Sequence, residues 1–243
     1  MSILLQDLRY GLWMLRKSPA FTFVAVLSLG LGIGANTTIF TLVNAVLLHS
    51  EPVKEMDRLV SVYTTDVKNQ GNFFAFMPVS RPNFLDYRDQ NDVFEGMAAA
   101  GGTAVSLSGS GEPEQLFAAM VTGNYFSLLG VPMQLGRGFL PDEDITPGTH
   151  PVVVLSDGLW KRRFASNPGI IGKTITLNNG IFTVVGVTPP GFTGLNALGG
   201  PDLYVPTMMH EQLLTGFLAE NFDNRRALLF NPFGRLKGGV SMA

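Results

Sequence analysis

The chain has 243 residues, of which 46% are hydrophobic and 15% are charged, and its formal net charge is −2. This composition is more apolar than that of an ordinary soluble domain, and the lack of a basic tract argues against nucleic acid as a partner. Cysteine is absent, which excludes disulfides and thiolate chemistry.

Residues 1–17 predict an amphipathic helix at the cytoplasmic surface of a membrane. Tyr10 and Trp13 are typical interfacial residues, and Pro19 is expected to turn the chain into the bilayer. This segment is either an extension of the membrane span or a contact for a cytoplasmic partner. Its apolar stripe consists of Leu4, Leu8, Leu12 and Leu15.

Residues 18–50 predict a transmembrane helix with an extension beyond the bilayer. The segment contains no Asp, Glu, Lys or Arg, and about 20 apolar residues already cross the hydrocarbon core. Arg9, Arg16 and Lys17 precede it, so the positive-inside tendency places the N-terminus in the cytoplasm. A cleaved signal peptide is the alternative, but the run is longer than a signal sequence needs and no A-x-A-like site follows.

One face of this span carries small and polar residues at three- and four-residue spacing. Small residues let two helix backbones approach, and hydroxyl or amide groups can bond across helices. The stripe therefore predicts contact with other transmembrane helices. Its residues are Gly30, Gly34, Thr38, Thr41 and Asn44.

Residues 51–243 predict one α+β domain, because short strands and short helices alternate without regular βαβ units. Asn178-Asn179-Gly180 between two strand-like runs is a hairpin signal. Ser156 or Asp157 can cap a helix over 158–165. The other expected helices are 81–95, 123–129 and 208–218, and the expected strands are 58–66, 96–108, 114–121, 152–155, 174–177, 181–188, 202–206 and 227–236.

No motif predicts a catalytic, cofactor or metal site. The run from Gly169 to Thr174 lacks the first glycine of a phosphate-binding loop, since that position holds Asn167. The histidines are isolated, and the acidic cluster 142–144 lacks the spacing of a calcium loop and is expected to be a solvated loop. We therefore expect a protein that is not an enzyme.

Several blocks of sequence, in order, resemble the permease subunits of MacB type, with their periplasmic core domain and FtsX-like membrane part. The similarity is greatest to the duplicated permeases without a fused ATPase, and it covers most of residues 7–243. The blocks are DLRYGLWMLRKSPAFT, LGLGIGANTTIFTLVNAVLL, VTGNYFSLLGVPMQLGRGFLPDED, VVVLSDGLWKRRFASNPGIIGKTITLNNGIFTVVGVTPPGF, DLYVP and GRLKGGVSMA.

This resemblance implies an inner-membrane permease subunit that couples a separate ABC ATPase to movement of a periplasmic domain, in export or in mechanical signalling. The implied partners are that ATPase, membrane lipid and further transmembrane helices, from the same full-length protein or a homodimer. The family continues through further spans, so the chain is interpreted as an N-terminal fragment. Asp7, Arg9, Trp13, Arg16 and Lys17 would form its cytoplasmic interface. The alternative is a single-span anchored module for binding or scaffolding, without energy coupling.

Overall fold

The structure is a computed structural model that describes residues 9–10, 13–47, 53–65, 76–109, 111–195 and 199–240, with the side chains of residues 42–47 left out. The chain divides into two compact units, Met1–Ser50 and Glu51–Ala243. Each unit is described by itself. Asp7, which the sequence assigns to the cytoplasmic interface, lies outside the described residues.

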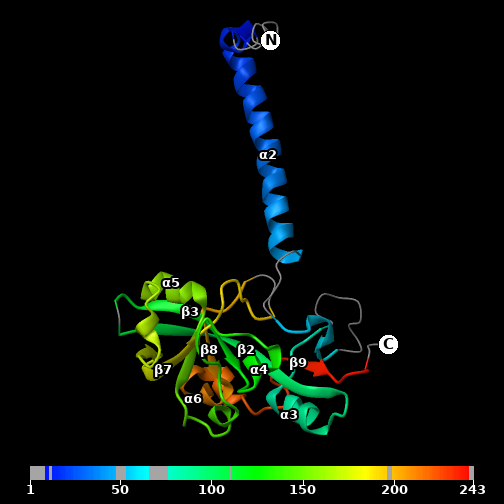
Figure 1. Ribbon diagram of the computed structural model, residues 1–243, viewed down its shortest axis with the longest axis vertical. Coiled ribbons are helices and arrows are strands. Elements are labelled where there is room, and N and C mark those ends of the chain that lie inside the picture. Colours follow the sequence, from blue (N-terminus) through cyan, green and yellow to red (C-terminus); the bar gives the residue numbers. More distant parts are fainter. Residues whose placement is uncertain are drawn as a thin grey trace. The chain divides into compact units, whose positions relative to one another are not determined.

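The first unit consists mainly of α2, which spans Pro19–Leu47 (Figure 1). Ser18 separates α2 from the helical residues 13–17, in line with the predicted break at Pro19. At about 1.5 Å per residue, its 29 residues are longer than the roughly 30 Å hydrocarbon core of a bilayer. The part Pro19–Thr41 has a mean hydropathy of 1.7, and by length and composition it can cross a membrane.

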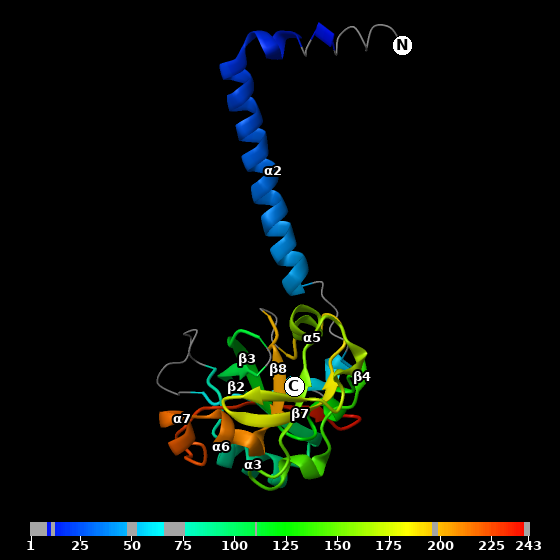
Figure 2. The ribbon, with the colours of Figure 1, turned by 90° about the vertical axis from the view of Figure 1, so that its left-hand side faces the viewer.

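The second unit is an α+β domain, as the sequence predicts (Figure 1, and Figure 2 in a view turned by 90°). Its strands are β1 (Leu59–Ser61), β2 (Phe94–Ser108), β3 (Glu114–Val121), β4 (Leu135–Gly136), β5 (Val152–Leu155), β6 (Thr174–Leu177), β7 (Gly180–Val187), β8 (Leu203–Pro206) and β9 (Asn231–Leu236). Its α-helices are α3 (Arg81–Gln90), α4 (Tyr125–Leu129), α5 (Asp157–Phe164), α6 (His210–Leu213) and α7 (Gly216–Glu220). Short 3₁₀ turns lie at Met56–Arg58, Pro141–Asp144, Pro168–Ile170 and Thr207–Met209.

All the strands belong to one mixed sheet, in the order β1-β9-β2-β3-β8-β5-β7-β4. β3 runs parallel to β8, and β5 runs parallel to β7. β6 pairs with both β7 and the end of β2, so the pairings β2-β3-β8-β5-β7-β6-β2 form a closed ring. A closed ring leaves fewer open strand edges than a flat sheet.

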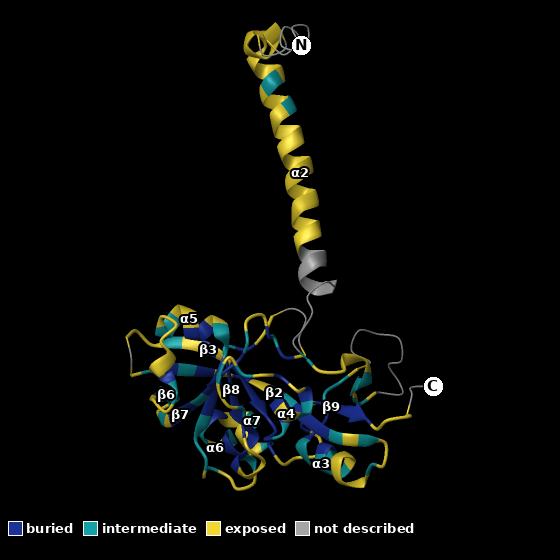
Figure 3. Cartoon of the chain, in the orientation of Figure 1, coloured by how far each residue is buried: buried dark blue, intermediate teal, exposed yellow. Residues whose placement is uncertain are grey.

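The alternation of side chains along the strands separates two cores. One core contains residues from every strand of the ring, among them Leu107, Leu116 and Phe182, together with buried residues of α3, α5 and α6. The other core lies on the opposite face and is rich in aromatic rings, including Tyr125, Phe126, Tyr204 and Phe233. Figure 3 shows the buried residues of these strands in dark blue, whereas the described side chains of α2 are mostly exposed and yellow.

Local sequence signals explain most of the element boundaries. Ser156 caps α5 by accepting a hydrogen bond from the amide of Leu159, and Gly130 ends α4 with a φ of 67°. In the hairpin, Asn178 and Asn179 are the two turn residues, with φ values of 47° and 72°, and Gly180 begins β7.

Several predicted elements have different bounds in the structure, and the largest differences are these. The strand expected at 58–66 is limited to β1, and the strand expected from residue 227 begins at Asn231. The helix expected over 81–95 ends at Gln90, and Phe94 belongs to β2. The helix expected over 208–218 is broken because Leu214 is extended, with a ψ of 146°. β4 was not predicted, because two residues carry no periodicity.

Candidate functional site at the junction of the globular unit

β1 is the first strand of the globular unit and β9 is the last, and these two strands are neighbours in the sheet. They pair antiparallel, with Leu59 opposite Arg235 and Ser61 opposite Phe233. In an antiparallel pair, the start of one strand lies beside the end of the other. The entry to the unit and the end of β9 therefore lie at the same place.

Two arginines, Arg235 and Arg58, connect the segment before β1 with β9. Arg235 lies in β9 with only 6% of its surface exposed. Its guanidinium donates to the carbonyl of Leu128 at 2.8 Å and to the carbonyl of Glu55 at 3.0 Å. Because Leu128 belongs to α4, this single buried side chain connects β9, α4 and the segment that precedes β1.

Arg58 lies at the same place and contacts both ends of the unit. It pairs with the carboxylate of Glu55, donates to the carbonyl of Leu236, and pairs with Glu95 at 2.5 Å. The hydrogen bond from Arg58 holds the pKa of Glu55 below its ordinary value, and the hydrogen bond to Glu95 raises the pKa of Arg58. We call this cluster of charged residues the junction; it consists of Glu55, Arg58, Glu95 and Arg235.

Backbone contacts reinforce the junction. The amide of Lys54 donates to the carbonyl of Leu129 at 2.9 Å, and the amide of Lys237 donates to the carbonyl of Val93 at 2.9 Å. A side chain at Gly130 would approach Lys54 Cβ to 2.7 Å, so α4 and the entry segment lie close together. Glu55 itself has a φ of 48°, a left-handed conformation that is uncommon outside glycine.

The junction residues were not singled out from the sequence. Arg58 and Leu236 are far apart in the chain, and no local pattern links them. One signal was available, since Arg235 is a charged residue inside the apolar run of β9, and a charge in such a place needs buried partners.

The cytoplasmic residues expected from the sequence lie on short helical pieces. The rings of Tyr10 and Trp13 are 6.2 Å apart, and Lys17 Nζ lies 4.7 Å from the centre of the Trp13 ring. Arg9, Trp13 and Arg16 are exposed. These residues are available for contact, but their role as an interface stays a prediction.

The expected packing face of α2 lies on consecutive turns of one helix. The hydroxyls of Thr38 and Thr41 donate to the carbonyls of Gly34 and Thr37, both at 2.8 Å. These hydroxyls are therefore satisfied within the helix and do not need a neighbouring helix as a partner. Gly30 and Gly34 have no side chains, so another helix could approach the backbone of α2 closely at these positions. The side chain of Asn44 lies outside the described residues.

The acidic cluster is a correction to the sequence interpretation. Glu143 is buried and forms two hydrogen bonds with Arg137, at 2.7 and 2.8 Å. Asp144 accepts hydrogen bonds from the amides of Gly123 and Met208. Only Asp142 is exposed. This is a structural cluster, not a solvated loop, and no group of acidic or histidine residues in the described part of the chain has the arrangement of a metal site.

Comparison with known proteins agrees with this architecture. The family model for the MacB-like periplasmic core domain matches residues 22–243. No curated protein sequence matches the chain.

Solved structures share the fold at low sequence identity. The periplasmic region of MacB from Actinobacillus actinomycetemcomitans matches with a TM-score of 0.57 and 17% identity, covering 78% of each chain. A domain of a putative permease from Porphyromonas gingivalis matches with a TM-score of 0.54 and 16% identity, covering 79% of this chain and 78% of the other. The extracellular domain of the noncanonical ABC-type transporter YknZ, from Gram-positive bacteria, matches with a TM-score of 0.51 and 13% identity, covering 74% of this chain and 84% of the other.

The family model covers nearly the whole chain, including most of α2, and the fold agrees with it. The chain therefore belongs to the family of MacB-like periplasmic core domains of ABC-type transporter permeases.

Proposed function

We propose that this chain is the part of a permease that transmits the cycle of a separate ABC ATPase to an extracytoplasmic domain. Residues 1–17 would lie on the cytoplasmic side, residues 18–50 would cross the bacterial inner membrane, and residues 51–243 would form the periplasmic domain. The system would export a substrate or transmit a mechanical signal. In this proposal the chain itself performs no chemical reaction.

The junction is the observation that carries the proposal. Any displacement of the segment before β1 acts first on Glu55 and Arg58. Arg58 donates to the carbonyl of Leu236 in β9, and the carbonyl of Glu55 accepts from Arg235. Arg235 in turn donates to the carbonyl of Leu128 in α4. A domain whose entry segment is hydrogen-bonded to several of its elements can move as a unit when that segment is displaced. A domain with loose attachments would absorb the displacement instead.

Two surfaces would join the chain to the rest of the machine. The exposed residues Arg9, Trp13, Arg16 and Lys17 would contact the ATPase, with Asp7 beside them. The face with Gly30, Gly34, Thr38, Thr41 and Asn44 would pack against other spans, in the same protein or in a second copy. The remaining circumference of α2 would contact lipid.

The test is the stimulation of ATP hydrolysis in nanodiscs, with the permease in its full natural length and the ABC ATPase encoded beside its gene. We expect Arg16→Glu combined with Lys17→Glu to abolish the stimulation, because both charges leave the proposed interface. Arg226→Glu is the control, since Arg226 is exposed on the globular unit and has no ion pair with another described residue. Equal effects of both variants would contradict the assigned interface.

The alternative is an anchored binding or scaffolding module without energy coupling. In that case the wild-type permease leaves ATP hydrolysis unchanged although it is folded and inserted. A direct measurement of binding to the ATPase separates this outcome from a damaged preparation. Absence of both binding and stimulation would favour the scaffolding module.

A further inference from the structure

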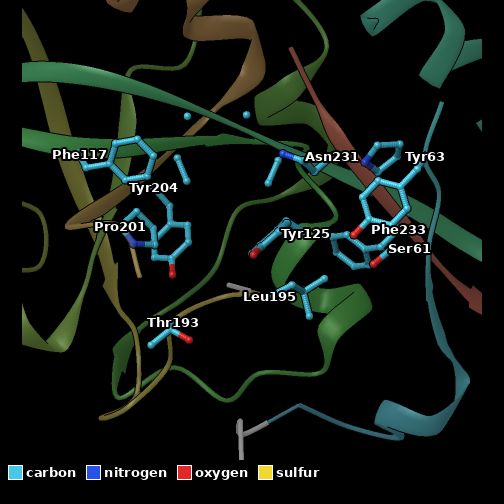
Figure 4. A pocket seen from close by; sticks show the side chains of 15 residues that line it. Ser61, Tyr63, Phe117, Tyr125, Thr193, Leu195, Pro201, Tyr204, Asn231 and Phe233 are labelled. Atoms are coloured by element: carbon cyan, nitrogen blue, oxygen red, sulfur yellow. The ribbon is translucent and has the colours of Figure 1, made fainter. Parts of the chain in front are cut away.

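A cavity of about 330 Å³ opens on the aromatic face of the globular unit, between β1, β2, β3, β8 and β9. Figure 4 shows Phe117 and Tyr63 on opposite sides of it, with the rings of Tyr204 and Tyr125 between them. This volume is at the lower end of the range of small-molecule sites in proteins.

The cavity exists because the strands beneath it carry very small side chains. Ala100 and Gly102 in β2 and Ala119 in β3 form its floor, and Gly102 pairs with Ala119. The Phe117 ring leans over Gly102, where an added Cβ would lie 2.5 Å from it. Larger residues on this floor would fill the space, as they do elsewhere in the aromatic core.

The walls favour an aromatic, uncharged ligand. Tyr125 lies 6.0 Å from Tyr204 and 5.5 Å from Phe233, so neighbouring rings already pack at the distances that favour ring contacts. No charged side chain is among the described residues that line the cavity. An ionic ligand would therefore lose its hydration without gaining an opposite charge.

The rim provides both apolar area and hydrogen-bonding groups. Phe117 is 50% exposed, Tyr63 is 46% exposed and Leu195 is 41% exposed, although all three border the same cavity. The side chains of Ser61 and Asn231 also line it and make no hydrogen bond with another described side chain or backbone group. They can bond a hydroxyl or carbonyl group of a ligand.

We propose that this cavity binds a small, neutral, aromatic molecule, with its ring between Phe117 and the tyrosines and its polar group toward Ser61 and Asn231. Nothing in this site requires ATP, a second span or a second copy of the chain. The proposal therefore goes beyond the transmission function, and it stands or falls separately from it.

The absence of cysteine permits a direct test on the whole chain in nanodiscs. Leu195→Cys places a thiol at the rim of the cavity, and Ile181→Cys is the control because Ile181 is exposed on β7 and does not line the cavity. The probe is 2-naphthylmethanol, a neutral two-ring alcohol, and the readout is the rate of alkylation by a water-soluble maleimide. Naphthalene-2-sulfonate serves as the charged comparator.

We expect 2-naphthylmethanol to slow the alkylation of the thiol at position 195 in a saturable manner and to leave position 181 unaffected. The sulfonate should protect neither position. Ala119→Phe, which fills the floor, should abolish the protection. Phe117→Ser changes only a half-exposed rim residue, so it should fold normally and raise the half-protecting concentration about two- to tenfold.

Three outcomes would overturn the proposal. The first is equal protection of both positions, which indicates partition of the probe into lipid. The second is protection that persists in a folded Ala119→Phe variant, and the third is no protection at all. If Ala119→Phe does not fold, as judged by its thermal transition, the Phe117→Ser result decides. An unchanged half-protecting concentration in that variant would then contradict the assigned site.

Discussion

Arg235 is the buried charge on which the junction depends. Replacement by Met keeps the length of the side chain but leaves the carbonyl of Leu128 without its donor, whereas the carbonyl of Glu55 keeps the amide of Arg58 as a donor. The unpaired carbonyl of Leu128 and the lost charged hydrogen bonds should lower the free energy of unfolding by about 2–4 kcal/mol. Thermal unfolding in detergent, followed by the fluorescence of the buried Trp160 in a Trp13→Phe background, measures the change.

Arg162→Met is the matched control for this prediction. Arg162 likewise has two partners, the carboxylates of Glu114 and Asp202, but its side chain is 52% exposed. Water screens such pairs, so the expected loss is below about 1 kcal/mol. Similar losses in the two variants would show that burial of Arg235 is not the source of its contribution.

The contribution of Glu143 to the free energy of unfolding depends on pH. Burial alone raises the pKa of Glu143, but hydrogen bonds from Arg137 and from the amide of Leu140 outweigh it, so the pKa lies below its ordinary value of 4.5. A lowered carboxyl pKa stabilises the fold above the ordinary value, and this contribution is lost as the pH falls through the folded-state pKa. The destabilisation caused by Glu143→Gln should therefore be full near pH 7 and shrink below about pH 4.5.

The measurement compares the unfolding free energies of wild type and Glu143→Gln between about pH 7 and about pH 3. The neighbouring exposed residue provides the control, since Asp142→Asn should show only a small difference across this range. A difference for Glu143→Gln that grows toward acid pH would contradict the assigned direction of the pKa shift.

At the scale of elements, the hairpin β6–β7 closes the ring of strands through its turn. Asn178 Oδ1 accepts from the amide of Ser106 at 2.9 Å, and Nδ2 donates to the carbonyl of Leu213 at 3.2 Å. Asn178→Gly keeps the left-handed backbone but removes both contacts, and should cost about 1–2 kcal/mol of unfolding free energy. Asn179→Gly is the control, because Asn179 is exposed and has the same handedness. Equal costs, measured by thermal unfolding, would contradict the closing role of Asn178.

The elements also indicate how far sequence alone determines this fold. β3, β5 and β6 have the predicted bounds because their apolar runs are bordered by turn residues. The break at Leu214 and the closure of β2 onto β6 were missed, since both depend on contacts between distant segments. The junction was missed for the same reason, whereas the run of small residues ending at Gly102 was a visible local signal for the cavity.

At the scale of the whole molecule, the amino-terminal span and the globular unit have different physical requirements. α2 exposes apolar side chains that water does not favour, such as Phe21 and Phe40. The globular unit instead buries its apolar side chains in two cores of its own. A membrane satisfies the first requirement and an aqueous compartment the second, as the proposed topology requires.

Single cysteines in the cysteine-free chain test this topology in spheroplasts. We expect Glu220→Cys, exposed on α7, to react with a membrane-impermeant maleimide from outside. Arg9→Cys should react only after lysis, because the remaining charges of Arg16 and Lys17 favour a cytoplasmic N-terminus in the proposed topology. Reaction of position 9 in intact spheroplasts would indicate the inverted orientation. A shortened product without this cysteine would indicate a cleaved signal peptide. Either result would remove the path by which a cytoplasmic ATPase could act on the junction through α2.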